Sequence, residues 1–246
     1  MMISSFERSP QQYARLAGVF YLAIILLGIF GELFVRGTLV VTGDAAATAN
    51  NILASPLLWR AGIVGDLLMQ VFDVPVIVIF YLLLRPVNES LALFATLINL
   101  VQTAVLVVNK LNLLLPLFLL QDTAYLNAFS AEQLHALSYL AIKAHGYGFA
   151  IGLIFFGFAC LATGYLIYQS QFLPKVLGVL LVVAGLCYLI NSIALLLAPA
   201  FASSLSLAIL APAFVGELSV ALWLMVKGVD KERWGRQATR LGMPRA

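Results

Sequence analysis

Charged residues are scarce in this chain of 246 residues: they make up 10% of it, whereas apolar residues make up 63%. A soluble domain usually carries about 25% charged residues, so the composition excludes an ordinary soluble protein and indicates an integral membrane protein. The length leaves room for one compact membrane domain and none for a second, soluble domain.

Cysteine and histidine are also rare, with two of each. Cys160 and Cys187 both lie in apolar stretches, which argues against a disulfide framework. Two histidines are too few for a multi-histidine metal centre, and neither a G-x-S-x-G nor an H-E-x-x-H motif occurs. We therefore expect no metal, no cofactor and no nucleic-acid partner, and no motif identifies a catalytic residue.

Long apolar stretches are what the chain has in abundance. A helix needs about 20 apolar residues to cross the hydrocarbon of a bilayer. Because lipid-exposed irregular backbone is unfavourable, we predict an all-α fold, a polytopic bundle of six transmembrane helices with no obvious broken helix. The six stretches are Tyr13–Phe34, Leu57–Leu84, Leu91–Leu119, Leu137–Tyr168, Leu173–Leu197 and Ser206–Val226.

Two local signals lie between these stretches. Asp44 is a suitable N-cap for a short helix from Ala45 to Leu53. Ser130, with Gln133 three residues later, forms a capping box that begins the fourth transmembrane helix.

Basic residues are distributed unevenly over the ends of the six stretches. If the N-terminus is cytoplasmic, Arg85, Lys175 and the whole basic tail lie inside, whereas few basic residues lie outside. The positive-inside rule therefore predicts that both termini are cytoplasmic. We expect one membrane domain, residues 1–226, and a basic cytoplasmic tail, residues 227–246. The tail, which contains Trp234, is either an anchor for anionic lipid or an ordinary positive-inside signal.

Polar residues at bilayer depth are the most informative feature. Asp66, Gln70 and Asp73 are spaced four and three residues apart, so they share a helical face about 60° wide. Polar groups inside a membrane are costly and almost always face the bundle interior or water. Hydrogen bonds that tie helices together are one explanation. A ligand or proton site is the other, because a desolvated carboxylate favours its protonated form.

A second polar group lies on the third and fourth stretches. Asn109 and Lys110 lie too far from the outer end for Lys110 to reach water easily. Counting about 1.5 Å of rise per residue places Lys110 and Asp66 at similar depths, so we expect them to form a charge pair. His145 lies near the same depth, either as a proton-transfer group or as an ordinary hydrogen-bonded histidine.

Three more groups complete the set. Asn191 lies on the fifth stretch, and Glu217 lies near the middle of the sixth, where an unpaired charge would be most costly. Glu32 and Arg36 are spaced as an i,i+4 ion pair at the outer end of the first stretch, where an interfacial structural role is expected.

Several local strings resemble a known family. They are Gly43-Asp44-Ala45-Ala46-Ala47-Thr48-Ala49, Leu84-Arg85-Pro86-Val87-Asn88, Gly164-Tyr165-Leu166-Ile167-Tyr168 and Leu177-Gly178-Val179-Leu180. The chain is similar over nearly its whole length to the bacterial integral-membrane family catalogued as domain of unknown function 4386. The resemblance implies a prokaryotic multi-pass protein of the cell membrane and assigns no activity. The family carries a histidine before the residue that matches Cys160, whereas this chain has Ala159.

Three functions remain open on the sequence alone. The first is binding or transport of a small polar or amphiphilic molecule in an outward-facing polar pocket. This function could be coupled to protons, and membrane lipids are the expected partners. Asp66, Asp73 and Glu217 would then titrate, and Lys110 would hold an anionic group or neutralise a carboxylate. The ligand would be oriented by Gln70, Asn109 and Asn191. The second is an accessory protein whose polar groups only join helices. The third is an intramembrane enzyme for a lipid-like substrate, with His145 and Asp66 as acid and base.

Overall fold

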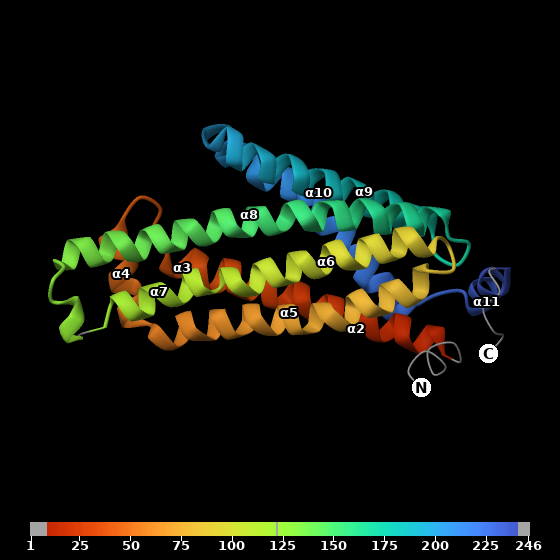
Figure 1. Cartoon of the computed structure of the whole chain (residues 1–246), viewed down its shortest axis with the longest axis horizontal. Helices are drawn as coiled ribbons and strands as arrows, with labels where there is room; N and C mark the ends of the chain where they lie inside the picture. The colour runs from red at the N-terminus through yellow and green to blue at the C-terminus, as the bar shows by residue number, and fades with distance from the viewer. Residues whose placement is uncertain (1–8, 122, 241–246) are drawn as a thin grey trace. The chain divides into compact units, whose positions relative to one another are not determined.

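The computed structural model describes residues 9–121 and 123–240, except for the side chains of residues 202–207 and 240. These residues form helices and no strands. The order along the chain is α2 (Pro10–Ile29), the π-helical segment η1 (Phe30–Arg36), α3 (Gly37–Leu39), α4 (Ala45–Ala54), α5 (Pro56–Leu84), α6 (Glu89–Asn109), α7 (Leu111–Leu119), the 3₁₀ turn η2 (Ala124–Leu126), α8 (Ala131–Gln169), α9 (Lys175–Leu197), α10 (Pro199–Val226) and α11 (Lys231–Arg240) (Figure 1).

Within the described residues, six helical stretches are long and apolar enough to cross a membrane. They are Pro10–Leu39, Pro56–Leu84, Glu89–Leu119, Ala131–Gln169, Lys175–Leu197 and Ala208–Val226. The predicted all-α architecture and its six spans are therefore confirmed.

The predicted local signals are present as well. The carboxylate of Asp44 accepts a hydrogen bond from the backbone N–H of Ala47 and caps α4. The capping box before α8 is complete, since the backbone N–H of Gln133 donates to Ser130 Oγ and that of Ser130 donates to Gln133 Oε1. Both predictions are therefore confirmed. They could be made from the sequence because a cap depends only on neighbouring residues.

The backbone divides into two compact units, and α2, α5, α6 and α8 each contribute one part to either unit. Unit 1 consists of residues 1–23, 72–103 and 150–246, and unit 2 consists of residues 24–71 and 104–149.

Glycines set the packing of α8 against α9 in unit 1. A Cβ atom added at Gly164 would lie 2.7 Å from the carbonyl oxygen of Gly178, and one added at Gly185 would lie 2.7 Å from that of Gly157. The two backbones are thus in direct contact at two levels, which small residues permit in membrane helices. Any larger side chain at these levels would push α8 and α9 apart.

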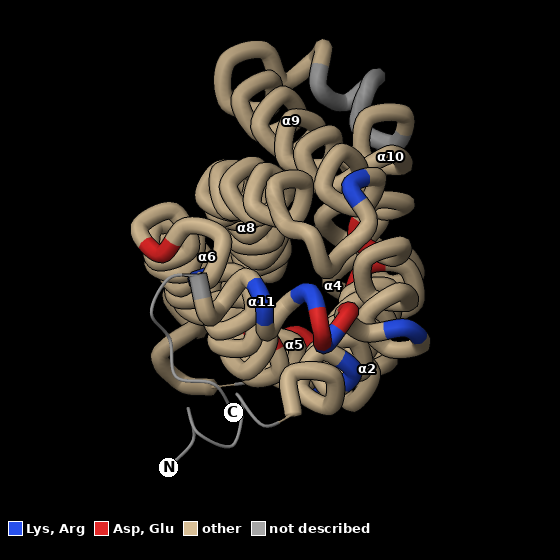
Figure 2. Tube along the Cα trace, turned by 90° about the vertical axis from the view of Figure 1, so that its right-hand side faces the viewer, with Lys and Arg blue, Asp and Glu red and all other residues tan. Residues whose placement is uncertain are grey.

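The C-terminal helix α11 is bound to unit 1 by side chains and backbone. Trp234 is 4% exposed and donates its indole N–H to the carbonyl oxygen of Leu83, 3.1 Å away. Gln11 binds the chain just before α11, because its amide nitrogen donates to the carbonyl oxygen of Lys227 at 2.7 Å. The Trp234 indole is therefore bonded within the protein and does not reach its surroundings. Figure 2 shows that charged residues are few along the helices and that several gather at α11.

The core of unit 2 is built around Trp59. Its indole N–H donates to the carbonyl oxygen of Leu113 on α7, 2.8 Å away, and its ring packs among buried aliphatic side chains that include Val35 and Ile63. Gly62 lies opposite Val35, and a Cβ there would come within 2.8 Å of that side chain. This packing fixes η1 and α7 against α5, and Arg36 of η1, Asp66 of α5 and Lys110 at the start of α7 are charged.

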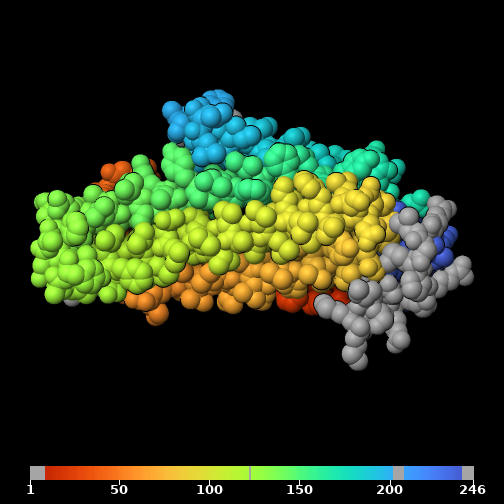
Figure 3. Space-filling view, in the orientation of Figure 1, coloured from red at the N-terminus to blue at the C-terminus, as the bar shows by residue number. Residues whose placement is uncertain are grey.

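Large apolar side chains also cover the outside of the helices. On the part of α6 that belongs to unit 1, Phe94, Leu97 and Val101 are 48%, 55% and 44% exposed, and α6 runs across the face drawn in Figure 3. Contiguous exposed apolar surface is unfavourable in water, whereas lipid chains cover it without cost. The helix surfaces are therefore suited to a bilayer.

Candidate functional site

Two helices of unit 2 depart from regular α-helical geometry, contrary to the expectation of unbroken spans. The first transmembrane stretch passes into the π-helical segment η1, which ends at Arg36. The third is interrupted at Lys110, whose backbone N–H bonds to the carbonyl of Val107 at 3.1 Å, three residues back instead of four. π-Helical segments occur frequently at functional sites. Each irregularity in this unit carries a cationic side chain.

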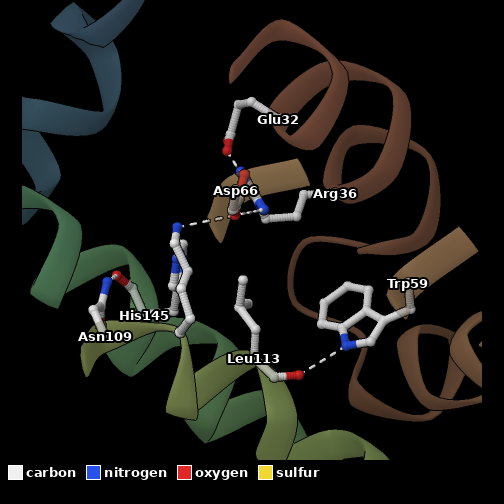
Figure 4. Close-up of polar contacts among 8 residues, drawn as sticks. Glu32, Arg36, Trp59, Asp66, Asn109, Leu113 and His145 are labelled. Atoms are coloured by element: carbon white, nitrogen blue, oxygen red, sulfur yellow. Dashed lines mark hydrogen bonds and ion pairs between the residues drawn. The ribbon is translucent and has the colours of Figure 1, made fainter. Parts of the chain in front are cut away.

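Both cations bind the same carboxylate. Arg36 Nη1 lies 2.8 Å and Lys110 Nζ lies 2.9 Å from Asp66 Oδ2, and the Asp66 side chain is 1% exposed. Figure 4 shows the side chains of Arg36 and Asp66 pointing toward each other. The predicted pair of Asp66 and Lys110 is confirmed, whereas Arg36 is a partner that sequence reasoning missed.

Gly31 allows the carboxylate to approach the first helix. A Cβ at this position would collide with Asp66 Oδ1 and would lie 3.0 Å from Arg36 Nη2. The ion pair therefore occupies the space of the missing side chain. Asp66 can lie between Arg36 of η1 and Lys110 because residue 31 is a glycine.

His145 on α8 completes the surroundings of Lys110. Its Nε2 lies 3.2 Å from Lys110 Nζ. A lysine ammonium group can only donate, so Nε2 must accept, and the imidazole is then neutral with its proton on Nδ1. The ring of Phe149 lies 6.0 Å from Lys110 Nζ. The ammonium group is thus surrounded by a carboxylate, an imidazole and an aromatic ring.

Asn109 links the interruption to α8. Its amide nitrogen donates to the backbone carbonyl of His145 at 2.9 Å, and its amide oxygen accepts from Asn112 Nδ2 at 3.0 Å. A Cβ at Gly148 would collide with the Asn109 amide, so this glycine makes the contact possible. Asn109 therefore positions Lys110 and His145 relative to each other.

The charge balance of this cluster is uneven. Arg36 and Lys110 supply two positive charges, and Asp66 supplies one buried negative charge. Glu32 Oε2 lies 2.8 Å from Arg36 Nε, but its side chain is 70% exposed. The second negative charge therefore comes from Glu32, whose exposed side chain can rotate away from Arg36 while the fold stays intact. We call Arg36, Asp66, Lys110 and His145 the unit 2 charge cluster.

The hydrogen bonds of this cluster do not involve two other candidate residues, Gln70 and Asn191. Gln70 is buried in unit 2, and its amide oxygen is unpaired within the described part of the chain. Asn191 is half-buried on α9 in unit 1.

Unit 1 holds the other two candidate carboxyl groups, Glu217 and Asp73. Glu217 on α10 is buried, and its Oε2 accepts from the hydroxyl of Tyr21 at 3.1 Å while its Oε1 accepts from Tyr188. Asp73 Oδ2 accepts from Thr103 Oγ1 at 2.6 Å. The three hydroxyl partners were missed by sequence reasoning, since nothing in their spacing distinguishes them from packing residues.

The eight candidate residues thus fall into two groups. Unit 2 contains Asp66, Gln70, Asn109, Lys110 and His145, and unit 1 contains Asp73, Asn191 and Glu217. Asp66 and Asp73 are seven residues apart on α5 and belong to different units. Their partners differ accordingly, because Asp66 binds cations and Asp73 binds a hydroxyl group.

Comparison with known proteins identifies relatives without assigning an activity. The model of the family described as domain of unknown function 4386 matches residues 16–228. An uncharacterised protein of Archaeoglobus fulgidus is 29% identical over 167 residues, which are 68% of this chain and 83% of the relative. No solved structure matches the chain.

Proposed function

This chain belongs to the family described as domain of unknown function 4386, and we propose that it binds or transports a small polar or amphiphilic molecule through the unit 2 charge cluster. The observation that carries the proposal is the sharing of one buried carboxylate, Asp66, between Arg36 and Lys110. The ligand class that suits the cluster is a molecule with an anionic head, such as a carboxylate or phosphate group.

The charge excess supports an anionic ligand. Joining helices requires only one pair of opposite charges, and each further buried charge adds a desolvation penalty of several kcal/mol, of the order known for buried ions. The second cation is balanced only by Glu32, which is largely exposed. A ligand carboxylate or phosphate can replace Glu32 at Arg36, whose planar guanidinium group binds such anions with two parallel hydrogen bonds.

The backbone of the cluster supports a ligand as well. In many transporters the substrate site is formed by interrupted helices near the bilayer interior. Here the interruption at Lys110 and the π-helical segment η1 lie on the two elements that carry the cations. Regular helices would serve a purely structural ion pair equally well.

The test uses octanoate and octyl phosphate as anionic probes and octanol as the uncharged control, with purified full-length protein in detergent at constant ionic strength. We expect both anions to raise the unfolding temperature, since a ligand at a hundredfold excess over its Kd stabilises by about 2.7 kcal/mol. Lys110→Met should abolish the effect. Lys143→Met is the matched control, because Lys143 is an exposed lysine of α8 that lies over the Tyr139 ring and outside the charge cluster.

Equal stabilisation by octanol, or stabilisation that survives in Lys110→Met, would contradict an anion site at this cluster. The cluster would then serve to join helices, as the accessory-protein hypothesis has it.

We also propose that the chain lies in the cell membrane of a prokaryote, with residues 1–226 as one membrane domain and both termini in the cytoplasm. The basic residues near the ends of α5, α9 and α10 and on α11 support this orientation through the positive-inside rule. Asp66 and Lys110 then lie in the outer halves of their spans, and the charge cluster faces outward.

Cysteine labelling tests this orientation in a variant in which Cys160 and Cys187 are replaced by serine. Asn127 and Gln171 are exposed residues in the turns before and after α8. We expect a membrane-impermeant thiol reagent to label Asn127→Cys on intact cells and Gln171→Cys only after permeabilisation. The reverse pattern would place the termini outside.

A further inference from the structure

Two carboxyl groups of unit 1, those of Asp73 and Glu217, have a different chemistry from Asp66, because their partners are hydroxyl groups. Glu217 is bonded to the phenols of Tyr21 on α2 and Tyr188 on α9, and Asp73 is bonded to Thr103 on α6. The part of the chain that the structure describes places no lysine, arginine or histidine in contact with either carboxyl group. Neither charge is therefore compensated by a cation.

Hydroxyl partners can serve a carboxyl group in both protonation states. A hydroxyl group donates one hydrogen bond and accepts two, whereas arginine and lysine side chains only donate. An ionised carboxylate accepts from the hydroxyl, and a protonated carboxyl group donates to the same oxygen after the O–H has rotated. A protonated Asp66 would find no acceptor on Arg36 or Lys110. Asp66 is thus held as an anion, whereas Asp73 and Glu217 can change their protonation state.

Thr103 shows this alternation directly. Its Oγ1 lies 2.6 Å from Asp73 Oδ2 and 3.1 Å from the carbonyl oxygen of Asn99. One hydroxyl proton can serve only one of these acceptors at a time. When Asp73 is ionised, Thr103 donates to it, and when Asp73 is protonated, Thr103 accepts from it and donates to Asn99. No heavy atom has to move.

Glu217 is likewise bonded to hydroxyl groups, those of Tyr21 and Tyr188, and aromatic rings pack against both tyrosines. Phe80 meets the Tyr21 ring edge-on at 6.3 Å, and Phe156 lies 5.4 Å from the Tyr188 ring. The other ionisable groups that interact electrostatically with Glu217 are Cys160 on α8 and Asp73 on α5. Apolar walls penalise a charge that no cation balances.

Unpaired buried polar atoms are a second, independent sign of a site in unit 1. Ser192 is fully buried, lies four residues after Tyr188 on the same face of α9, and its Oγ has no partner among the described residues. Gln102 is buried beside Thr103 in the sequence, and its amide oxygen is likewise unpaired within the described residues. A buried polar atom without a partner costs about 1–3 kcal/mol, so it calls for a ligand or water.

We propose that Asp73 and Glu217 are two proton-binding sites of unit 1, at which each carboxylate takes up a proton from water and releases it again while its hydroxyl partners rotate in place. This inference does not depend on the anion site in unit 2. It differs from the expectation drawn from the sequence, because it assigns proton binding to Asp73 and Glu217 and withholds it from Asp66.

Infrared difference spectroscopy tests the proposal on the purified full-length protein, by following the C=O stretch of protonated carboxyl groups as the pH is changed. We expect two buried carboxyl bands that appear and disappear reversibly. Glu217→Gln should remove one and Asp73→Asn the other, while Tyr188→Phe should shift the frequency of the Glu217 band by removing its hydrogen-bond partner. Lys110→Met should leave both bands, which separates this result from the anion test.

Isotope labelling identifies the bands without mutation, in case a variant does not fold. ¹³C-labelled glutamate should shift one band and ¹³C-labelled aspartate the other. The proposal is overturned if no buried carboxyl band responds to pH, if both bands persist in Glu217→Gln and in Asp73→Asn, or if sodium chloride removes a band at constant pH, because sodium would then be the ligand.

Discussion

Replacing Asp66 with asparagine is expected to destabilise the protein by about 3–5 kcal/mol, the cost typical of removing one partner of a buried ion pair. The substitution leaves Lys110, whose side chain is only 3% exposed, without its counter-charge, and Arg36 retains only the exposed carboxylate of Glu32. The measurement is unfolding of the detergent-solubilised protein in increasing fractions of sodium dodecyl sulfate, followed by circular dichroism.

Two further variants show whether the loss comes from the uncompensated charge. Glu32→Gln removes a carboxylate that is 70% exposed, so it should cost no more than about 1 kcal/mol, as surface ion pairs do. Adding Lys110→Met to Asp66→Asn removes the unpaired cation and should restore part of the stability. If the double variant loses as much unfolding free energy as Asp66→Asn and Lys110→Met lose in sum, the charge argument is wrong.

The second large effect is expected at the seam between α8 and α9. In Gly178→Ala the new Cβ would lie 2.5 Å from the carbonyl oxygen of Gly164 and 2.6 Å from the backbone nitrogen of Tyr168. Backbone atoms cannot rotate away as side chains do, so the helices must separate along the seam. We expect a loss of about 1–3 kcal/mol, the range typical of overpacking, in the same unfolding measurement.

Gly146→Ala is the matched control on α8, because a Cβ at Gly146 meets nothing within 4 Å. Alanine is favoured over glycine inside a helix by about 0.5–1 kcal/mol, so this variant should be slightly more stable than the natural protein. The two substitutions add the same methyl group and should have opposite signs. A Gly178→Ala variant as stable as Gly146→Ala would show that the seam is not tightly packed.

The spans could be predicted from the sequence because each depends on one local property, a run of about 20 apolar residues. The predicted first, second and third stretches lie within the observed Pro10–Leu39, Pro56–Leu84 and Glu89–Leu119. The caps at Asp44 and Ser130 were equally predictable, since each involves residues three positions apart. The π-helical segment could not be read in this way, because its apolar content is that of an ordinary helix.

The part of the site that could be predicted is the part for which the depth of a residue along its helix is sufficient to identify its partner. Asp66 and Lys110 pair because their charges are opposite and their depths are similar. Arg36 was missed as their partner because Glu32, four residues earlier, already accounted for it. Tyr21 and Tyr188 were missed because contacts between helices depend on rotation and neighbour order, which the hydrophobic pattern of a single helix does not contain.

The glycine contacts of α8 and α9 close one side of unit 1 to lipid. At the levels of Gly157 with Gly185 and of Gly164 with Gly178, the two backbones touch and no side chains stand between them. An acyl chain could enter there only by forcing the helices apart. An amphiphile that approaches Asp73 or Glu217 from the bilayer must therefore enter between other helices, because the contact between α8 and α9 leaves no room for it.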